Sequence, residues 1–261
     1  MIPKIFIEQW QNNFPWQSLD MVEQDLIIGR ALVCLYSNPE IKNNLVFRGG
    51  TALNKLYLKP SSRYSEDLDF VQKDSAVPIG KTMDKVRSVL DSWLGEPKRI
   101  KSEHSSKLIY RYSSVNNMPM RLKIEVNTEE TFQILKLREK LYGVNSKWFN
   151  GECLIPIYQI EELMATKIRA LYQRRKGRDL FDLWLIFNQN LANVDESIVI
   201  FKKYCERAGI KISKTLFLEN LELKRLNQDF QTDMNILLPD GAGWNFEVAF
   251  DYVVKNIVNK L

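Results

Sequence analysis

The segment Phe47–Val71, with the sequence FRGGTALNKLYLKPSSRYSEDLDFV, constrains the fold more strongly than any other part of the chain. Its apolar start predicts a short buried strand that ends at two glycines, and TALNKLYL predicts one or two helical turns. The segment closes with DLDFV, which has the composition of a second strand but carries two carboxylates. A strand, a glycine turn, a helix and a second strand in this order predict an α+β fold for the first half of the chain.

Two acidic residues, Asp67 and Asp69, stand one residue apart in the second of these strands. Residues i and i+2 of a strand point to the same face, so the two carboxylates are expected to project together. Carboxylates this close repel each other unless a cation lies between them, and Mg²⁺ typically binds one or two carboxylates together with substrate phosphates. Taken alone, the pair also fits an edge strand with a solvated face.

The turn Gly49-Gly50-Thr51 has the residues that a phosphate site needs. Glycines let the backbone approach a phosphate closely, and Thr51 would add a hydroxyl at the positive end of a helix dipole. The alternative is a tight strand-to-helix turn capped by Thr51, and both interpretations can hold at once. In the following loop, KPSSRYS, Arg63 and Ser65 would either contact the nucleotide or hold the loop against the sheet.

A third carboxylate, Glu125, occurs in RLKIEVN, where it alternates with Lys123 and Asn127 on one face of a predicted strand. If this strand lies beside DLDFV, Glu125 can approach the acidic pair. Three carboxylates on adjacent strands form the two-metal geometry of in-line phosphoryl transfer. Glu125 would equally well pair with a lysine on the surface of the sheet.

The patterning of the remaining chain predicts two domains. IGKTMDKVRSVLDSWL is amphipathic and helical, whereas KLIYRYSSV and PMRLKIEVN alternate as antiparallel strands, which completes a mixed sheet of about four or five strands with flanking helices. Beyond about residue 155 the chain becomes helical, so we expect domains at 1–155 and 156–261. Asp20 with Glu23 fits a capping box, Gly177 suits a helix C-cap, and Asp179 suits the next N-cap.

A basic stretch lies in the predicted helical domain, with no acid before Asp179. Its members are Lys167, Arg169, Arg174, Arg175, Lys176 and Arg178. On a continuous helix Lys167 and Arg174 would share a face. The stretch is either a solvated face, with Lys and Arg favoured near a helix C-terminus, or a site for a triphosphate or an RNA backbone.

Composition excludes several classes of site. The net charge of +5 permits an anionic partner without proving one. The three cysteines are widely spaced and form no CxxC pair, so neither a thiolate metal site nor a disulfide-linked partner is expected. His104 is the one histidine and lies in a polar stretch, which leaves nothing for a histidine-based zinc site or a Ser-His-Asp triad. With no signal-peptide or membrane-span pattern, we expect a cytoplasmic protein that does not interact with membranes.

The combined motifs resemble those of the DNA polymerase beta-like nucleotidyltransferase superfamily. Within it, FRGGTALNKLY, RYSEDLDF and KIRALYQRRKGRDLFDLW are similar to the AbiEii/AbiGii toxin family of type IV toxin–antitoxin and abortive-infection systems, which includes the MenT toxins. The resemblance covers roughly residues 45–190. It implies a polymerase-beta-like core followed by a C-terminal helical domain. One departure is the spacing of Thr51 from Asp67, which is longer than in many members of the superfamily and suggests an insertion at the basic loop.

The resemblance implies roles for further residues. The family requires a lysine on the helix and an aspartate of an Arg-Asp motif, and the matching positions are Lys167, Arg178 and Asp179. Lys167 would contact nucleotide phosphates, and Asp179 would orient a basic group or act as a base. Asp182 lies near Asp179 on the same helix face, and the sequence does not decide between them.

The function expected from these features and from the resemblance is metal-dependent transfer of NMP from an NTP to a hydroxyl, with the 3′ end of tRNA as the expected acceptor. Asp67, Asp69 and Glu125 would bind Mg²⁺ or Mn²⁺, whereas Gly49, Gly50, Thr51, Ser65, Lys167 and Arg178 would bind the nucleotide. RNA would contact Arg63, Arg174, Arg175 and Lys176. A cognate antitoxin would act without a stable complex. The alternatives are NMP transfer to a protein hydroxyl and a non-catalytic nucleotide- or RNA-binding regulator.

Overall fold

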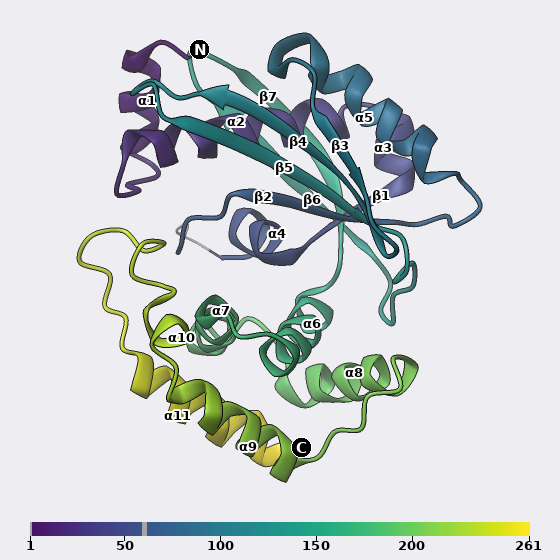
Figure 1. Ribbon diagram of the computed structural model, residues 1–261, viewed down its shortest axis with the longest axis vertical. Helices are drawn as coiled ribbons and strands as arrows, with labels where there is room; N and C mark the ends of the chain where they lie inside the picture. The colour runs from purple at the N-terminus through teal and green to yellow at the C-terminus, as the bar shows by residue number, and fades with distance from the viewer. Residues whose placement is uncertain (1, 59–61) are drawn as a thin grey trace. The chain divides into compact units, whose positions relative to one another are not determined.

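The computed structural model describes residues 2–58 and 62–261, and it divides into two compact units, Met1–Tyr158 and Gln159–Leu261 (Figure 1). Each unit has its own core, and each is described by itself. Residues 59–61 begin the basic loop that was interpreted as an insertion, and they lie outside the described residues.

A seven-stranded mixed sheet forms the centre of the first unit, in the order β3-β4-β5-β2-β1-β7-β6 (Figure 1). The strands are β1 (Leu45–Arg48), β2 (Asp67–Gln72), β3 (Lys98–Lys101), β4 (Ser105–Ser113), β5 (Pro119–Asn127), β6 (Arg138–Asn145) and β7 (Asn150–Ile157). β2 pairs antiparallel with β1 and parallel with β5, and β1 pairs parallel with β7. The two strands of the segment Phe47–Val71 therefore lie side by side in the interior of the sheet.

The α+β class is confirmed, but the expected four or five strands are too few. β3 escaped prediction because all of its residues, KRIK, are exposed, so its sequence has no apolar alternation. β6 and β7 form an antiparallel pair at the opposite edge, where Leu141 and Leu154 are paired and both exposed. An edge strand that shows apolar residues on its solvated face lacks the clean alternation by which strands are recognised.

Helices cover the apolar face of this sheet. The first unit contains α1 (Lys4–Gln11), α2 (Leu19–Tyr36), α3 (Pro39–Asn44), α4 (Gly49–Leu56) and α5 (Ile79–Leu94). The Tyr36 ring of α2 lies 6.0 Å from the Phe70 ring of β2, and the Tyr110 hydroxyl of β4 donates to Asp91 of α5 at 2.8 Å. Leu68 and Phe70 are buried on this side, so their neighbours Asp67 and Asp69 project from the other face.

The start of α2 differs from the expected capping box at Asp20 and Glu23. The N-cap is Ser18, whose hydroxyl accepts from the Met21 N–H at 3.2 Å. Glu23 is buried, and its carboxylate accepts from the Val115 N–H at 2.6 Å. Glu23 thus binds a loop beyond β4 instead of the end of its own helix.

The second unit is helical. It contains α6 (Ile160–Gln173), α7 (Gly177–Asn188), α8 (Val194–Arg207), α9 (Lys214–Arg225), α10 (Gln228–Thr232), α11 (Phe246–Asn256) and a short 3-10 helix, η1 (Val258–Lys260). Gly177 is not the C-cap that the sequence suggested, since α6 ends at Gln173 and Gly177 begins α7. A Cβ at Gly177 would collide with the Phe230 carbonyl oxygen, so the glycine allows α7 to approach α10 closely. No helix in the described part of the chain is long and apolar enough to cross a membrane.

Candidate functional site

The face of the sheet opposite α2 carries a patch of charged residues. In the parallel pairing of β2 with β5, Asp67 lies beside Lys123 and Asp69 lies beside Glu125. Glu125 is also opposite Lys107 of β4, and Asp69 is opposite Arg48 of β1. β5 does lie next to β2, which is the condition on which the proximity of Glu125 to the acidic pair depended.

Lysines neutralise part of this patch. The Lys123 Nζ lies 2.8 Å from Asp67 Oδ2 and 3.4 Å from Glu125 Oε2. The Lys107 Nζ lies 3.1 Å from the other oxygen of Glu125. Burial acts to raise the pKa of Glu125, but the hydrogen bond from Lys107 and the smaller effects of other neighbours lower it below its ordinary value. Glu125 therefore pairs with lysines on the sheet surface, as the alternative interpretation of the sequence expected.

Asp69 lies against the glycine turn. Gly49 has φ +81°, and a Cβ placed there would be 2.6 Å from Asp69 Oδ2. Burial raises the pKa of Asp69, and the neighbouring Asp67 carboxylate adds to the increase, while Lys123 and Arg48 oppose it. Only glycine can adopt this backbone conformation at position 49 and also leave room for the Asp69 carboxylate. The two halves of the predicted nucleotide site, the glycine turn and the acidic pair, are thus in contact within the first unit.

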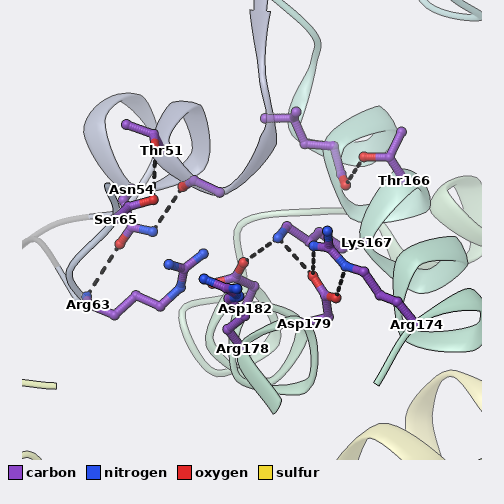
Figure 2. Close-up of polar contacts among 12 residues, drawn as sticks. Thr51, Asn54, Arg63, Ser65, Thr166, Lys167, Arg174, Arg178, Asp179 and Asp182 are labelled. Carbon is purple, nitrogen blue, oxygen red and sulfur yellow. Dashed lines mark hydrogen bonds and ion pairs between the residues drawn. The ribbon is translucent and has the colours of Figure 1, made fainter. Parts of the chain in front are cut away.

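Thr51 connects α4, the helix that begins at Gly49, to β2, the strand that carries Asp67 and Asp69. Its Oγ1 lies 2.6 Å from the Ser65 Oγ and donates to the backbone carbonyl of Asp67, so the side chain is buried (Figure 2). It does not cap α4, because the N-cap is Arg48 and makes no side-chain capping bond. Thr51 and Ser65 together fix the position of the residue that carries the first carboxylate.

Arg63 packs on the first turn of α4 (Figure 2). It is buried, its Nη1 donates to the Tyr64 carbonyl at 3.0 Å, and its Nη2 occupies the space that a Cβ of Gly50 would need. Asn54 joins the two segments, because its Nδ2 donates to the Gly50 carbonyl at 2.9 Å and its Oδ1 accepts from the Arg63 N–H. A guanidinium is therefore held beside the start of the glycine helix, where an anion would also be favoured by the helix dipole.

The donor set of this face fits a divalent cation bound by two carboxylates. Asp67 and Asp69 provide hard oxygen ligands on one face, and Mg²⁺ commonly takes one or two carboxylates, with phosphates and water completing its shell. Among the described residues, no three acidic, histidine or cysteine side chains gather closely enough to hold a metal ion. The role of Glu125 as a third ligand stays a prediction.

A buried ionic cluster forms a second group of candidate residues, in the helical unit (Figure 2). The Lys167 Nζ lies 3.0 Å from Asp179 Oδ1 and 2.7 Å from Asp182 Oδ2. Arg174 donates to both Asp179 oxygens, from Nε at 2.7 Å and from Nη2 at 2.9 Å. Burial acts to raise the pKa of Asp179, but Lys167 and Arg174 together hold it well below its usual range. Both aspartates thus contact Lys167, and Asp179 also binds Arg174. Whether Asp179 orients a basic group or acts as a base stays a prediction.

The basic stretch is not one helix. α6 ends at Gln173, so Arg174, Arg175 and Lys176 lie in the connection to α7, where all three are exposed. Asp179 is in the first turn of α7, whose N-cap is Lys176, so the prediction of Asp179 as N-cap is wrong. Arg174 reaches Asp179 because the chain turns between α6 and α7, and not because the two residues share the face of one helix.

Arg178 and Lys224 complete the surroundings of this cluster. The Arg178 backbone N–H donates to Asp233 Oδ2 at 3.0 Å, and its side chain is partly exposed. Lys224, which the sequence did not single out, donates from Nζ to the carbonyls of Leu171 and Tyr172 at the end of α6. A lysine at a helix C-terminus stabilises its last carbonyls, but nothing in the sequence near Lys224 links it to a helix some fifty residues earlier.

Gln24 is a further residue that the sequence does not mark as part of the site. It is buried in α2, and its Nε2 donates to the carbonyls of Glu66 at 3.1 Å and Arg121 at 2.9 Å, while its Oε1 accepts from the Tyr112 hydroxyl. Gln24 thereby bridges β5 and the residue just before β2, beside the first carboxylate. Gln24 stands between Glu23 and Asp25, so nothing in the sequence marked it as a buried residue.

The chain is similar to known proteins in sequence and in fold. A search of curated proteins found no match. Two solved structures have similar folds. The nucleotidyltransferase toxin MenT4 from Mycobacterium tuberculosis has a TM-score of 0.72 at 19% identity, covering 100% of this chain and 91% of that one. A candidate nucleotidyltransferase from H. pylori has a TM-score of 0.52 at 19% identity, with coverage of 94% and 99%. A family model described as the nucleotidyl transferase AbiEii toxin of type IV toxin–antitoxin systems matches residues 30–252, and the chain therefore belongs to this family of nucleotidyltransferases.

Proposed function

We propose that this nucleotidyltransferase transfers NMP from an NTP to a hydroxyl acceptor, with the tRNA 3′ end as the acceptor. The observation that carries the proposal is the contact of Asp69 with Gly49, because it brings a metal-binding carboxylate to the backbone turn that suits a phosphate. Asp67 lies on the same face of β2, and the buried Arg63 guanidinium lies at Gly50. Carboxylates for a cation and donors for a triphosphate are thus provided within one unit.

The residues of this face would bind the metal and the phosphates separately. Asp67 and Asp69 would hold Mg²⁺ or Mn²⁺, which when bound neutralises charge on the triphosphate. The Gly49-Gly50 backbone and Arg63 would bind the phosphates. The acceptor oxygen forms a bond to the α-phosphorus, the bond from that phosphorus to the bridging oxygen breaks, and pyrophosphate leaves with the electron pair. The acceptor proton is released to water.

The RNA acceptor is supported by the charge of the chain. Arg175 and Lys176 are exposed in the connection between α6 and α7, and the chain carries a net charge of +5. Exposed arginines and lysines contact phosphates without reading sequence. The antitoxin implied by membership of a type IV system is a further partner, and we propose that it acts without a stable complex.

The test is incubation of the purified protein with total tRNA, each of the four labelled NTPs and either Mg²⁺ or Mn²⁺. Wild type is compared with Asp69→Asn and with Asp84→Asn, an exposed acid paired with Arg99. We expect label at the tRNA 3′ end with wild type and Asp84→Asn, and none with Asp69→Asn or after chelation. Label on protein instead of RNA would favour the protein-hydroxyl alternative. Nucleotide binding without any transfer would favour the non-catalytic regulator.

A further inference from the structure

Lys123 occupies a position that the proposed chemistry does not use. Its backbone lies beside Asp67 in the β2–β5 pairing, and its ammonium contacts both Asp67 Oδ2 and Glu125 Oε2. We propose that Lys123 is a built-in counter-ion of the acidic face, that it competes with the divalent cation for the Asp67 carboxylate, and that its ammonium is displaced when the cation binds. This inference rests on the proposed function, because it assumes that the cation binds at Asp67 and Asp69.

The sheet fixes the position of Lys123 in relation to the acids. The register of β2 with β5 sets Lys123 opposite Asp67 and Glu125 opposite Asp69, so the lysine lies on the carboxylate face by strand alternation. Its side chain is 27% exposed, which leaves its flexible stem room to move its ammonium toward solvent. The strand pairing therefore fixes the Lys123 backbone beside Asp67, whereas the Lys123 ammonium can move away from the Asp67 carboxylate.

Electrostatics explains why the contact forms and why it opposes the metal. Carboxylates on one face repel each other, and an ammonium among them relieves that repulsion. The Lys123 Nζ lies 2.8 Å from Asp67 Oδ2, so the ammonium and the carboxylate attract each other as an ion pair. A divalent cation bound by the same Asp67 carboxylate is repelled by the ammonium at short range. We therefore expect the bound cation to displace the Lys123 ammonium from Asp67.

Lys107 provides an internal comparison. It also pairs with Glu125, at 3.1 Å, and is about as exposed as Lys123, at 30%. No ion pair joins Lys107 to Asp67 or Asp69 among the contacts of the described residues. Competition for the metal ligand should therefore depend on Lys123 and not on Lys107, although both lysines contribute the same charge to this face of the sheet.

The test is a titration of Mn²⁺ into the nucleotide-free protein, followed by the electron paramagnetic resonance of the free ion. We expect Lys123→Gln to bind Mn²⁺ about tenfold more tightly than wild type, because a short-range repulsion between cations is removed. Lys107→Gln should stay within about twofold of wild type, since its charge lies farther from the ligands. Lys123→Arg keeps the charge and should bind as weakly as wild type. Thermal unfolding of each variant confirms that it is folded.

The outcomes separate the two proposals. Equal or weaker binding by Lys123→Gln, with binding by wild type that Asp69→Asn abolishes, overturns the role of Lys123 and leaves the metal site intact. An equal gain for Lys107→Gln also overturns it, because general charge would then explain the effect. Equal binding by wild type and Asp69→Asn, or no binding by wild type and Lys123→Gln, overturns the metal assignment and this inference together.

Discussion

Asp69 lies so close to Gly49 that a methyl group on the glycine would be 2.6 Å from the carboxylate oxygen Oδ2. This contact joins two motifs that stand twenty residues apart in the sequence. Position 49 requires glycine for two reasons: its φ of +81° disfavours any side chain, and the Asp69 carboxylate occupies the space that a Cβ would need. The closeness of the glycine turn and the Asp69 carboxylate is the geometric basis for our proposal that phosphate and metal bind side by side.

Gly49→Ala is expected to reduce transfer far more than its loss of stability explains. A non-glycine residue in the left-handed region costs about 1–2 kcal/mol, and the added methyl also displaces the Asp69 carboxylate. The matched control is Gly95→Ala, since Gly95 has φ +79° with nothing within 4 Å of its Cβ position. Urea denaturation and NMP transfer are measured for both. Equal activities at equal stability would show that the contact with Asp69 has no functional importance.

Gln24→Leu is expected to lower the transfer rate by loosening the start of β2. The variant leaves the carbonyls of Glu66 and Arg121 without this donor, at about 1–3 kcal/mol for each buried group. Gln72→Leu is the control, because Gln72 is also buried and donates to two carbonyls, but it lies at the far end of β2 from the acids. We expect similar stability losses in the two variants and an activity loss confined to Gln24→Leu. A comparable fall in both rates would make Gln24 merely structural.

Lys167→Met is expected to destabilise the helical unit as well as to reduce activity. The ammonium bridges two carboxylates that are both buried, and removing one partner of a buried pair costs about 3–5 kcal/mol, here lessened by the bond of Arg174 to Asp179. Calorimetry and NMP transfer are measured together, with Lys202→Met as an exposed control. An unchanged melting temperature would contradict the structural part of this role. The double variant Lys167→Met/Asp182→Asn should recover part of the stability.

Lys224 is expected to make stability increase with pH above about 8. Burial lowers the pKa of Lys224 to about 8, with Arg175 adding to the decrease and Asp179 opposing it. The unfolded lysine titrates near 10.4. Between these values the unfolded chain binds a proton that the folded chain has lost, so this residue contributes stability that grows as pH rises from about 8 toward 10.4.

The measurement is the free energy of unfolding of wild type and Lys224→Met from urea titrations between pH 7 and 10. Other groups titrate in this range, so the informative quantity is the difference between the two proteins. We expect the advantage of wild type over Lys224→Met to increase with pH. A difference that stays constant across the range would show that Lys224 keeps its ordinary pKa in the folded protein.

The central elements of the fold could be predicted because their residues carry strong local patterns. The amphipathic sequence of α5 predicted a helix with the bounds that the structure shows, Ile79–Leu94. β1, α4 and β2 follow in the predicted order, and the family resemblance is confirmed. The edge strand β3 was missed because all of its residues are exposed, and β6 was missed because Leu141 places an apolar residue on its solvated face.

The candidate site could be predicted only as far as local spacing reaches. Strand alternation placed Asp67 and Asp69 on one face, but Lys123, 56 positions after Asp67, became its partner through the register of two strands. A sequence does not reveal that register, because it is set by packing across the whole sheet. The bond of Arg174 to Asp179 was likewise hidden, since the break after Gln173 replaced the continuous helix on which the spacing argument relied.

The most direct measurement is the rate of NMP transfer to tRNA by wild type and Asp69→Asn at saturating NTP and Mg²⁺, with both proteins shown to be folded. Asp69→Asn keeps the size of the side chain against Gly49 but removes the negative charge. We predict that the rate falls about a hundredfold or more, the usual consequence of removing a group that stabilises transition-state charge. Transfer at the wild-type rate by Asp69→Asn would contradict the assignment of this face as the active site.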